Sequence, residues 1–304
     1  MVLSTDERKV KYSIVIPVHN NASDLRRCLA SLDAQSYHND LFEVIVVDNN
    51  STDDTVSVAE AAGVTCLREL DFQSSYAARN RGIKAAHGDF IAFLDSDCVA
   101  DPDWLMQIDA RTEDVTAGCF AGEILSVQPT TTVEHFSEAI GLLRQRGPLS
   151  GWHFKPYAQT GNATYRKVVF ERIGLFDPTI KSGGDAILAW RMLDRTNFRI
   201  QFVPEAIVYH HHRTSVQDLW FQFRRYGGGM MSWTLSQSGY QPPTVTQLGA
   251  DLKEAIDRLV AKLEGTGAST QDIIFPILRS MTQVAHYSGY LEELLRLITH
   301  DAPH

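Results

Sequence analysis

The sequence has few cysteines, and none of them stand close enough together to form a known metal or disulfide motif. Its four cysteines are Cys28, Cys66, Cys98 and Cys119. They form no Cys-x-x-Cys pair, so neither a zinc ribbon nor a disulfide framework is expected. We expect reduced thiols buried in the interior.

Long apolar runs, a signal-peptide core and an excess of positive charge are also missing. No uninterrupted apolar run reaches the length needed to cross a bilayer, and Met1 to Lys11 is polar and charged. The net charge of −9 argues against nucleic acid as a partner. We expect a cytoplasmic protein with no transmembrane segment, with peripheral attachment at the inner face of the membrane as the alternative.

Two nucleotide-binding fingerprints are absent as well. The chain contains neither Gly-x-Gly-x-x-Gly nor Gly-x-x-x-x-Gly-Lys-Ser/Thr, so dinucleotide and P-loop sites lack their usual signals. What the chain has instead is an alternation of short apolar runs and helical stripes. Strands are predicted at 12–18, 42–48, 64–67 and 90–94.

Helices are predicted between these strands. Pro17 is expected to end the pairing of the first strand, and Gly88 to cap a helix over 76–87. The alternation predicts an α/β fold with a parallel sheet, and such sheets bind ligands beyond the carboxyl ends of their strands.

One of those strand ends carries two acids. The run Phe90–Leu94 is followed by Asp95, Ser96 and Asp97. Two carboxylates beside a turn suggest a hard divalent cation, Mn²⁺ or Mg²⁺, which shares its shell with a substrate phosphate. The alternative is a capped turn, since Asp101-Pro102 is typical of a helix start.

Four segments then occur in register at close spacing: 15–20, 46–53, 78–83 and 94–97. Together they resemble the inverting family 2 glycosyltransferases of the GT-A fold, over roughly residues 11–230. The resemblance implies a Rossmann-like, mixed and mostly parallel sheet flanked by helices, with a C-terminal helical extension. The expected domains are a flexible N-terminus at 1–10, a catalytic domain at 11–230 and a helical region at 231–304.

The resemblance also implies roles for individual residues on the donor side. The predicted nucleotide-sugar-binding residues are Pro17, His19, Asn20, Asp48, Asn49, Arg79, Asp95 and Ser96. Asn49 stands where the family pattern has an acid, and its amide offers both a donor and an acceptor. Asp97 and His210 are the predicted metal ligands. Alternation along a strand places His210 and His212 on one side, which makes His212 the second choice.

On the acceptor side, Asp185 matches the catalytic base, a role that a carboxylate at hydrogen-bond distance from a hydroxyl can perform. Capping of the following helix is the alternative role for Asp185. Gly184 and Ile187 replace acids of the family pattern. The remaining predicted residues of the acceptor and diphosphate side are Trp152, Gly161, Asn162, Gly184, His212, Gln222 and Arg225.

The last part of the chain is helical. An apolar stripe from Val245 to Leu263 and a second amphipathic helix over 277–298 follow a break at Pro242-Pro243. They could cover the catalytic domain, form a homodimer or rest on a membrane. Glu292 and Glu293 stand beside basic residues on the second helix, which favours intramolecular packing or dimerisation.

The sequence therefore predicts a metal-dependent inverting glycosyltransferase. It would move a sugar from a nucleotide diphosphate donor, with a UDP-sugar preferred, to a hydroxyl of a carbohydrate, lipid-linked or other acceptor. One alternative is a sugar-nucleotide-binding pseudoenzyme, which the Gly184 and Ile187 departures keep open. Another is a sugar nucleotidyltransferase, although 16–24 lacks the expected Gly-rich loop with a basic residue.

Overall fold

The computed structural model describes residues 10–151, 154–241, 244–264 and 270–300. Contacts divide the chain into two compact units. Unit 1 comprises Met1–Leu125, Leu143–Thr179 and Asp185–His211, and unit 2 comprises Ser126–Leu142, Ile180–Gly184 and His212–His304. The domain boundaries expected after residues 10 and 230 stay predictions.

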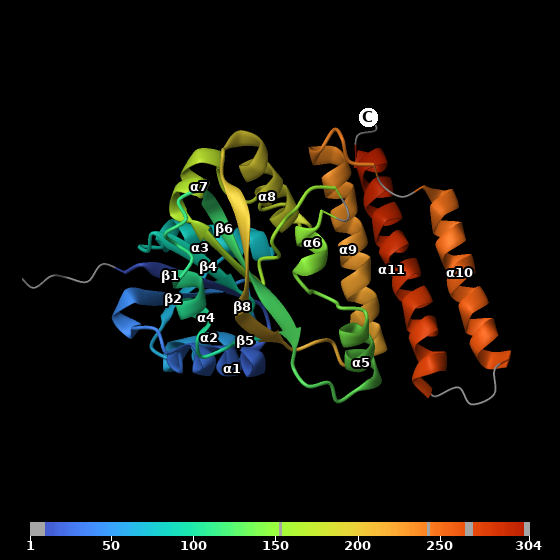
Figure 1. The fold of residues 1–304 in the computed structure, drawn as a ribbon, viewed down its shortest axis with the longest axis horizontal. Coiled ribbons are helices and arrows are strands. Elements are labelled where there is room, and N and C mark those ends of the chain that lie inside the picture. Colours follow the sequence, from blue (N-terminus) through green and yellow to red (C-terminus); the bar gives the residue numbers. More distant parts are fainter. Residues whose placement is uncertain (1–9, 152–153, 242–243, 265–269, 301–304) are drawn as a thin grey trace, which may run out of the picture. The chain divides into compact units, whose positions relative to one another are not determined.

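In the described part of the chain an eight-stranded sheet forms, in the order β3-β2-β1-β4-β7-β6-β8-β5 (Figure 1). Its strands are β1 (Tyr12–Val18), β2 (Phe42–Asp48), β3 (Thr65–Arg68), β4 (Phe90–Leu94), β5 (Cys98–Ala100), β6 (Ala117–Ser126), β7 (Asn162–Arg166) and β8 (Arg199–His210). The first four run parallel, whereas β7 pairs antiparallel with β4 and β6, and β5 with β8. The predicted α/β class, with a mixed and mostly parallel sheet, is confirmed.

Helices cover both faces of this sheet in unit 1. They are α1 (Ala22–Asp33), α2 (Thr55–Ala61), α3 (Ser75–Ala85), α4 (Trp104–Asp109), α6 (Arg146–Leu149), α7 (Lys167–Ile173) and α8 (Gly184–Arg195), with a 3₁₀ turn at Asn39–Leu41. In Figure 1, α1 and α2 lie on one face, and α3 and α7 on the other. Alternate residues of β1 and β4 contribute side chains to the apolar layers on the two faces of the sheet, because side chains alternate along a strand.

A large apolar cluster forms the layer under α1 and α2. Ile14, Ile16 and Val18 of β1 pack there with Leu25 and Leu29 of α1. On the opposite face, Phe93 of β4 meets Phe176 edge-on, with 5.7 Å between ring centroids. Burial of this apolar surface is the main favourable term for the unit, and it holds the strand ends in place.

Three local expectations were wrong. Pairing of β1 with β2 continues past Pro17 to Val18↔Asp48, while pairing with β4 ends at Val15↔Phe93, so the missing N–H of Pro17 removes no bond to β2. Gly88 is not a helix cap. A Cβ there would lie 2.7 Å from the backbone N of Ser13, so the glycine allows close packing on β1. Finally, α4 begins at Trp104, two residues after the predicted start, although Asp101 Oδ1 accepts from Asp103 N at 3.1 Å, as expected of a capping residue.

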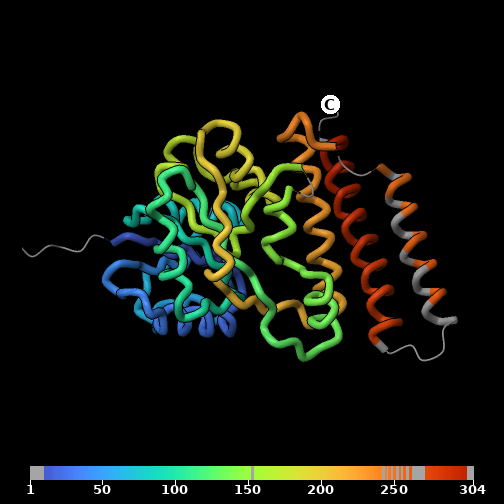
Figure 2. Tube along the Cα trace, in the orientation of Figure 1, coloured from blue at the N-terminus to red at the C-terminus, as the bar shows by residue number. Residues whose placement is uncertain are grey.

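Unit 2 contains the helices α5 (Thr132–Ala139), α9 (Val216–Ser236), α10 (Val245–Glu264) and α11 (Thr270–His300). Figure 2 shows α9 and α11 side by side. Their backbones touch through glycines. A Cβ on Gly227 would lie 1.7 Å from His286 O, and a Cβ on Gly289 would lie 1.8 Å from Arg224 O. Any larger side chain at either position would force the helices apart.

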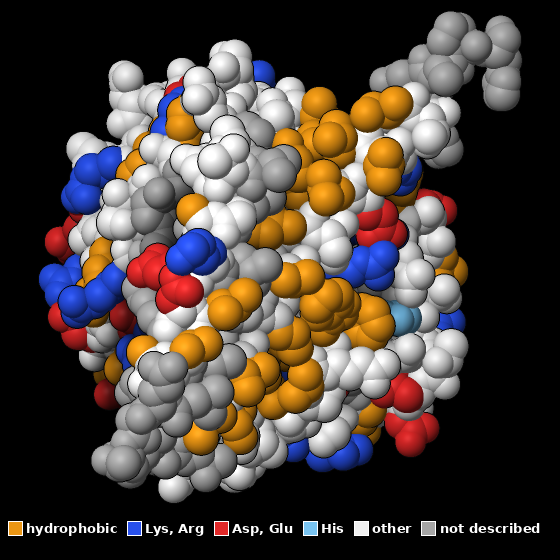
Figure 3. All heavy atoms as spheres, turned by 90° about the vertical axis from the view of Figure 1, so that its right-hand side faces the viewer, with side chains coloured by type: hydrophobic (Ala, Val, Ile, Leu, Met, Phe, Trp, Pro, Cys, Tyr) orange, Lys and Arg blue, Asp and Glu red, His pale blue; other side chains and the backbone are white. Residues whose placement is uncertain are grey.

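Apolar side chains also remain exposed on α11. Ile277, Val284, Leu291 and Ile298 recur every seven residues, and Leu295 lies among them. A broad band of hydrophobic side chains is visible in Figure 3. Among the described residues, no helix combines the length and the hydropathy needed to cross a membrane.

The α9–α11 contact gives a first prediction. Gly289→Ala should lower the free energy of unfolding by about 1–3 kcal/mol, because the new Cβ meets backbone that cannot rotate away. Gly228→Ala is the matched control, since its Cβ would have only an ordinary 3.9 Å contact. Exchanging Gly for Ala inside a helix gains about 1 kcal/mol. Thermal unfolding measures both variants, and equal melting temperatures would contradict the close approach.

Candidate functional site

The loops that follow β1 and β2 are joined to each other at the carboxyl edge of the sheet. His19 Nδ1 lies 2.9 Å from Asn49 O, and Asn20 Oδ1 accepts from Thr52 N at 2.7 Å. Asn20 holds this position with a φ of 48°, a left-handed conformation that asparagine tolerates. Parallel strands bring their carboxyl ends to one edge, so the predicted nucleotide loops form one surface.

Asp48 and Asn49 are buried at the end of β2. Asp48 Oδ1 accepts from Ser51 N at 3.1 Å, whereas Oδ2 has no hydrogen-bond donor among the described residues. Arg68 Nε lies 3.6 Å from Oδ2. Asp48 therefore offers one buried acceptor for the N–H of a ligand.

Asn49 is used differently. Its amide nitrogen donates to Glu69 O at 3.2 Å and to Phe72 O at 2.8 Å. Both amide hydrogens thus hold the loop after β3, so Asn49 cannot donate to a base in this arrangement. The sequence allowed the Asn49 amide to act as both donor and acceptor toward a ligand. In the structure its donor group is used for structural hydrogen bonds.

Asp95, Ser96 and Asp97 form a tight turn between β4 and β5, closed by a bond from Cys98 N to Asp95 O of 3.0 Å. Arg79 of α3 binds the Asp95 carboxylate through Nη2. Its Nε is buried and has no hydrogen-bond partner among the described residues. A Cβ on Gly161 would come within 3.3 Å of Asp95 Oδ2, so a glycine there permits the close backbone approach.

The two predicted metal ligands come together in unit 1. In the β5–β8 pair, Cys98 lies opposite His210, which brings His210 beside the preceding Asp97. His210 Nε2 lies 3.4 Å from Asp97 Oδ1. Among the described residues, no group of three or more His, Cys, Asp or Glu side chains forms a metal-ligand cluster. One carboxylate and one imidazole suit a cation that takes its other ligands from phosphate and water.

Asp185 lies in the first turn of α8 and is half-buried. Its Oδ1 accepts from Ala186 N at 3.1 Å and from Tyr76 Oη at 3.4 Å. Burial raises the pKa of Asp185, and the nearby Arg79 guanidinium opposes that rise. A carboxylate with a raised pKa is a stronger base than an ordinary aspartate, as proton abstraction from a hydroxyl requires.

Asn162 does not fit its predicted place on the acceptor side. It is fully buried, and Nδ2 donates to Glu123 O and Ala206 O, each at 2.9 Å, while Oδ1 accepts from Trp104 Nε1 at 2.8 Å. These bonds connect three strands and α4 inside the sheet. Its side chain is therefore structural. Trp152, predicted nearby, lies outside the described residues.

Four predicted residues belong to unit 2. His212 Nε2 bonds to Ser126 Oγ at 2.8 Å, and Gln222 Nε2 donates to Tyr226 Oη at 2.8 Å. Arg225 is exposed beside the Tyr226 ring. Since β8 ends at His210, the strand alternation expected for the histidines does not reach His212.

Gly184, the fourth of these residues, is buried and ends the segment Ile180–Gly184. The carbonyl of Gly183 accepts from Trp233 Nε1 of α9 at 2.9 Å. Gly183 has a φ of 80°, a left-handed conformation that suits glycine. The residues that precede Asp185 in the chain are thus fixed by a buried indole.

Tyr76 was missed by the sequence analysis, although it contacts Asp185. Its ring stacks on Phe176 at 5.3 Å, and the Arg79 guanidinium lies 5.5 Å from the ring centroid. Residues three apart share one face of a helix. The three-residue spacing between Tyr76 and Arg79 was the signal in the sequence that could have identified Tyr76 as a site residue.

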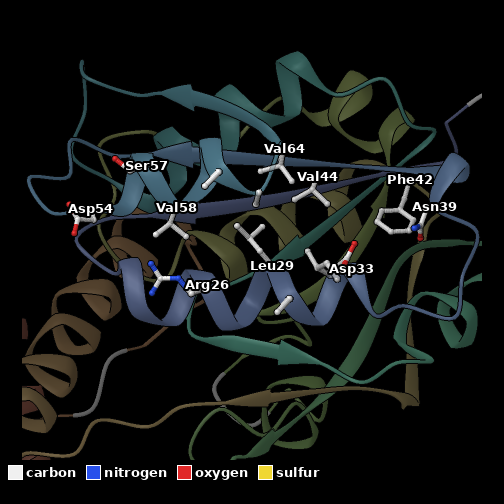
Figure 4. Close-up of a pocket in the computed structure, with 14 residues that line it drawn as sticks. Arg26, Leu29, Asp33, Asn39, Phe42, Val44, Asp54, Ser57, Val58 and Val64 are labelled. Carbon is white, nitrogen blue, oxygen red and sulfur yellow. The ribbon is translucent and has the colours of Figure 1, made fainter.

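A separate groove of about 730 Å³ lies among α1, β2 and α2 (Figure 4). Leu29, Val44, Val58 and Val64 form part of its apolar lining, and Arg26 and Asp54 also line it. Its lining includes none of the predicted site residues. The groove therefore does not belong to the site at the strand ends.

Comparison with known sequences matches residues 13–174 to the family described as glycosyl transferase family 2. The pre-mycofactocin glycosyltransferase of Mycobacterium tuberculosis is 31% identical over 245 residues, which cover 78% of this chain and 50% of that protein. Glycosyltransferase AglE of Haloferax volcanii is 30% identical over 232 residues, 74% of this chain and 75% of that protein. The chain thus spans about half the length of the mycobacterial relative.

Among solved structures, the mannosyltransferase PcManGT from Pyrobaculum calidifontis, in complex with GDP-Man and Mn²⁺, has a TM-score of 0.65. The two are 17% identical, and the match covers 95% of this chain and 88% of that chain. The likeness shows the fold, and the GT-A class expected from the sequence is confirmed.

The bonds of Asn162 give a second prediction. Asn162→Ala should lower the free energy of unfolding by about 2–4 kcal/mol, because it leaves buried donors and acceptors without partners. The exposed Asn39→Ala is the control and should change stability little. Urea unfolding measures both. A stable Asn162→Ala protein that had lost nucleotide affinity would instead assign this side chain to the ligand.

Proposed function

The chain belongs to glycosyl transferase family 2, and from that premise we propose that it transfers a sugar from a nucleotide diphosphate donor to an acceptor hydroxyl. The observation that carries this proposal is a continuous set of contacts in unit 1. It runs from Asp95 at the strand edge through Arg79 and Tyr76 to Asp185. These contacts connect Arg79, which is suited to binding a diphosphate, with Asp185, which is suited to accepting a proton.

The donor side is supported by two unfilled polar atoms. The buried Nε of Arg79 is a spare cationic donor, and a diphosphate oxygen would satisfy it. Asp48 Oδ2 would accept one N–H from the base. Uracil presents a single N–H between two carbonyl groups, whereas guanine presents adjacent N–H groups that need two acceptors. Thymine presents the same single N–H as uracil, so Asp48 favours a UDP- or dTDP-sugar over a GDP-sugar. Of these we propose a UDP-sugar, and a thermal-shift comparison of UDP, GDP and dTDP tests that preference.

Asp97 and His210 would hold a Mn²⁺ or Mg²⁺ ion beside the diphosphate. Such an ion, when bound, stabilises the negative charge that builds up on the leaving diphosphate. PcManGT was solved in complex with GDP-Man and Mn²⁺, which supports the use of a divalent cation with a nucleotide sugar in this fold. The two protein ligands leave most of the cation's shell to the nucleotide, so we expect metal and nucleotide to bind cooperatively.

Asp185 would act as the general base. As the acceptor oxygen bonds to the anomeric carbon, the bond from that carbon to the diphosphate oxygen breaks, and the hydroxyl proton moves to Asp185. Attack from the side opposite the leaving group inverts the configuration. The acceptor is a hydroxyl of a carbohydrate, a lipid-linked glycan or another molecule, and a homodimer through α10 and α11 remains a further proposal.

A sugar-nucleotide-binding pseudoenzyme is the second candidate, because Gly184 and Ile187 stand where the family pattern has acids. Hydrolysis of UDP-glucose in the presence of Mn²⁺ separates the two. Turnover supports the transferase, whereas tight binding without turnover supports the pseudoenzyme.

The histidines provide a third prediction. His210→Ala should weaken the binding of UDP with Mn²⁺, because it removes the imidazole beside Asp97. His212→Ala is the matched control and should retain wild-type affinity, since His212 bonds to Ser126 instead. Calorimetry with UDP, with and without Mn²⁺, measures both. The reverse order of effects would transfer the ligand role to His212.

Asp185 provides a fourth prediction. Asp185→Asn should bind UDP and Mn²⁺ normally but lose about 10²–10⁴-fold in kcat, because an amide cannot accept the proton. In the wild type, activity should fall as the pH drops through a pKa above the ordinary aspartate value, since the base must be deprotonated. A cap role alone predicts near-normal turnover for Asp185→Asn, because Asn caps a helix as well as Asp does.

A further inference from the structure

The Asp185 carboxylate is held asymmetrically. Ala186 N and Tyr76 Oη both donate to Oδ1, at 3.1 Å and 3.4 Å. The lone pairs of Oδ1 are therefore engaged. No side chain or backbone group of the described residues donates to Oδ2, which is the oxygen left to face an acceptor hydroxyl. A carboxylate that is fixed at one oxygen presents the other in a defined direction.

Tyr76 is itself rigidly placed. Its ring stacks on Phe176 at an interplanar angle of 24°. Phe176 is fixed in turn by Asn80 of the same helix, which donates to Phe176 O at 2.9 Å and accepts from Phe176 N at 3.0 Å. Rotating the phenol away from Asp185 would therefore lose its stacking on Phe176, whose backbone Asn80 holds in place.

We propose that Tyr76 is a positioning residue that orients Asp185 so that Oδ2 takes the proton of the acceptor hydroxyl. This inference rests on the proposed function, because it assumes that Asp185 is the base. It also implies that α3 supplies residues to both the donor side and the acceptor side of the site. Arg79 and Tyr76 lie one turn apart, and the first binds Asp95 on the donor side while the second binds the base.

The charges that act on Asp185 make the effect of Tyr76 measurable. Arg79 of α3 stabilises the ionised form, while Asp95 at the end of β4 and burial oppose it. Tyr165 of β7 also interacts electrostatically with Asp185. A phenol O–H donated to the carboxylate favours the ionised form, so its removal should raise the pKa of Asp185.

Tyr76→Phe is the test, because it keeps the ring stacking and removes only the hydroxyl. Carbon-13 NMR titration of labelled aspartates, with the Asp185 signal identified by its loss in Asp185→Asn, should show a higher pKa in Tyr76→Phe. Hydrolysis of UDP-glucose with Mn²⁺ should show a kcat lowered about tenfold with unchanged KM, and an acidic limb moved to higher pH.

Tyr37→Phe is the matched control. Tyr37 also donates its hydroxyl to a carboxylate, that of Asp109, but outside the site, so neither readout should change. The double variant Tyr76→Phe/Asp185→Asn should be no slower than Asp185→Asn, since Tyr76 acts through Asp185. An unchanged pKa or an unchanged kcat in Tyr76→Phe overturns the inference.

The same set of variants separates this inference from the function on which it rests. If Asp185→Asn hydrolyses UDP-glucose normally, the base assignment fails. If Asp185→Asn is inactive and Tyr76→Phe matches the wild type in both readouts, only the role of Tyr76 fails.

Discussion

A buried guanidinium must have a counter-ion, and the arrangement of the site follows from how Arg79 meets that requirement. Its side chain is 5% exposed and binds the Asp95 carboxylate. Leaving such a charge unpaired would cost several kcal/mol, so α3 and the turn after β4 are constrained to lie together. The same guanidinium lies over the Tyr76 ring, lowers the pKa of Asp185 against the effect of burial, and keeps one N–H available.

The features that the sequence predicted well are those set by local pattern. Apolar runs gave β1, β2 and β4 with the bounds the structure has, because a strand buried on both faces must be apolar throughout. The acids after β2 and β4 then had to lie at one edge, since parallel strands end together. The Asp97–His210 pair was predicted only because the family pattern supplied it, as a strand pairing over that separation has no local signal.

The features that failed depend on what surrounds a residue. Asn162 looks like a ligand-facing amide in sequence, yet bonds to three elements remove it from any surface. Gly88 looks like a helix cap in sequence. In the structure a glycine is required there because a Cβ would clash with the backbone of β1. Tyr76 carries no signature of its own, because its importance comes from Phe176 and Asp185, which reach it from distant parts of the chain.

The pairing of β5 with β8 has a consequence for the order in which the protein assembles. The loops after β1 and β2 follow strands joined by a short crossover, so their contacts can form early and locally. Asp97 and His210 meet only after the chain has closed a loop of roughly a hundred residues. Contacts over such a separation form slowly, because loop closure costs entropy. A partly folded chain with ordered loops after β1 and β2 would still lack the Asp97–His210 pair. If these two residues hold the proposed cation, its binding would therefore report the completion of unit 1.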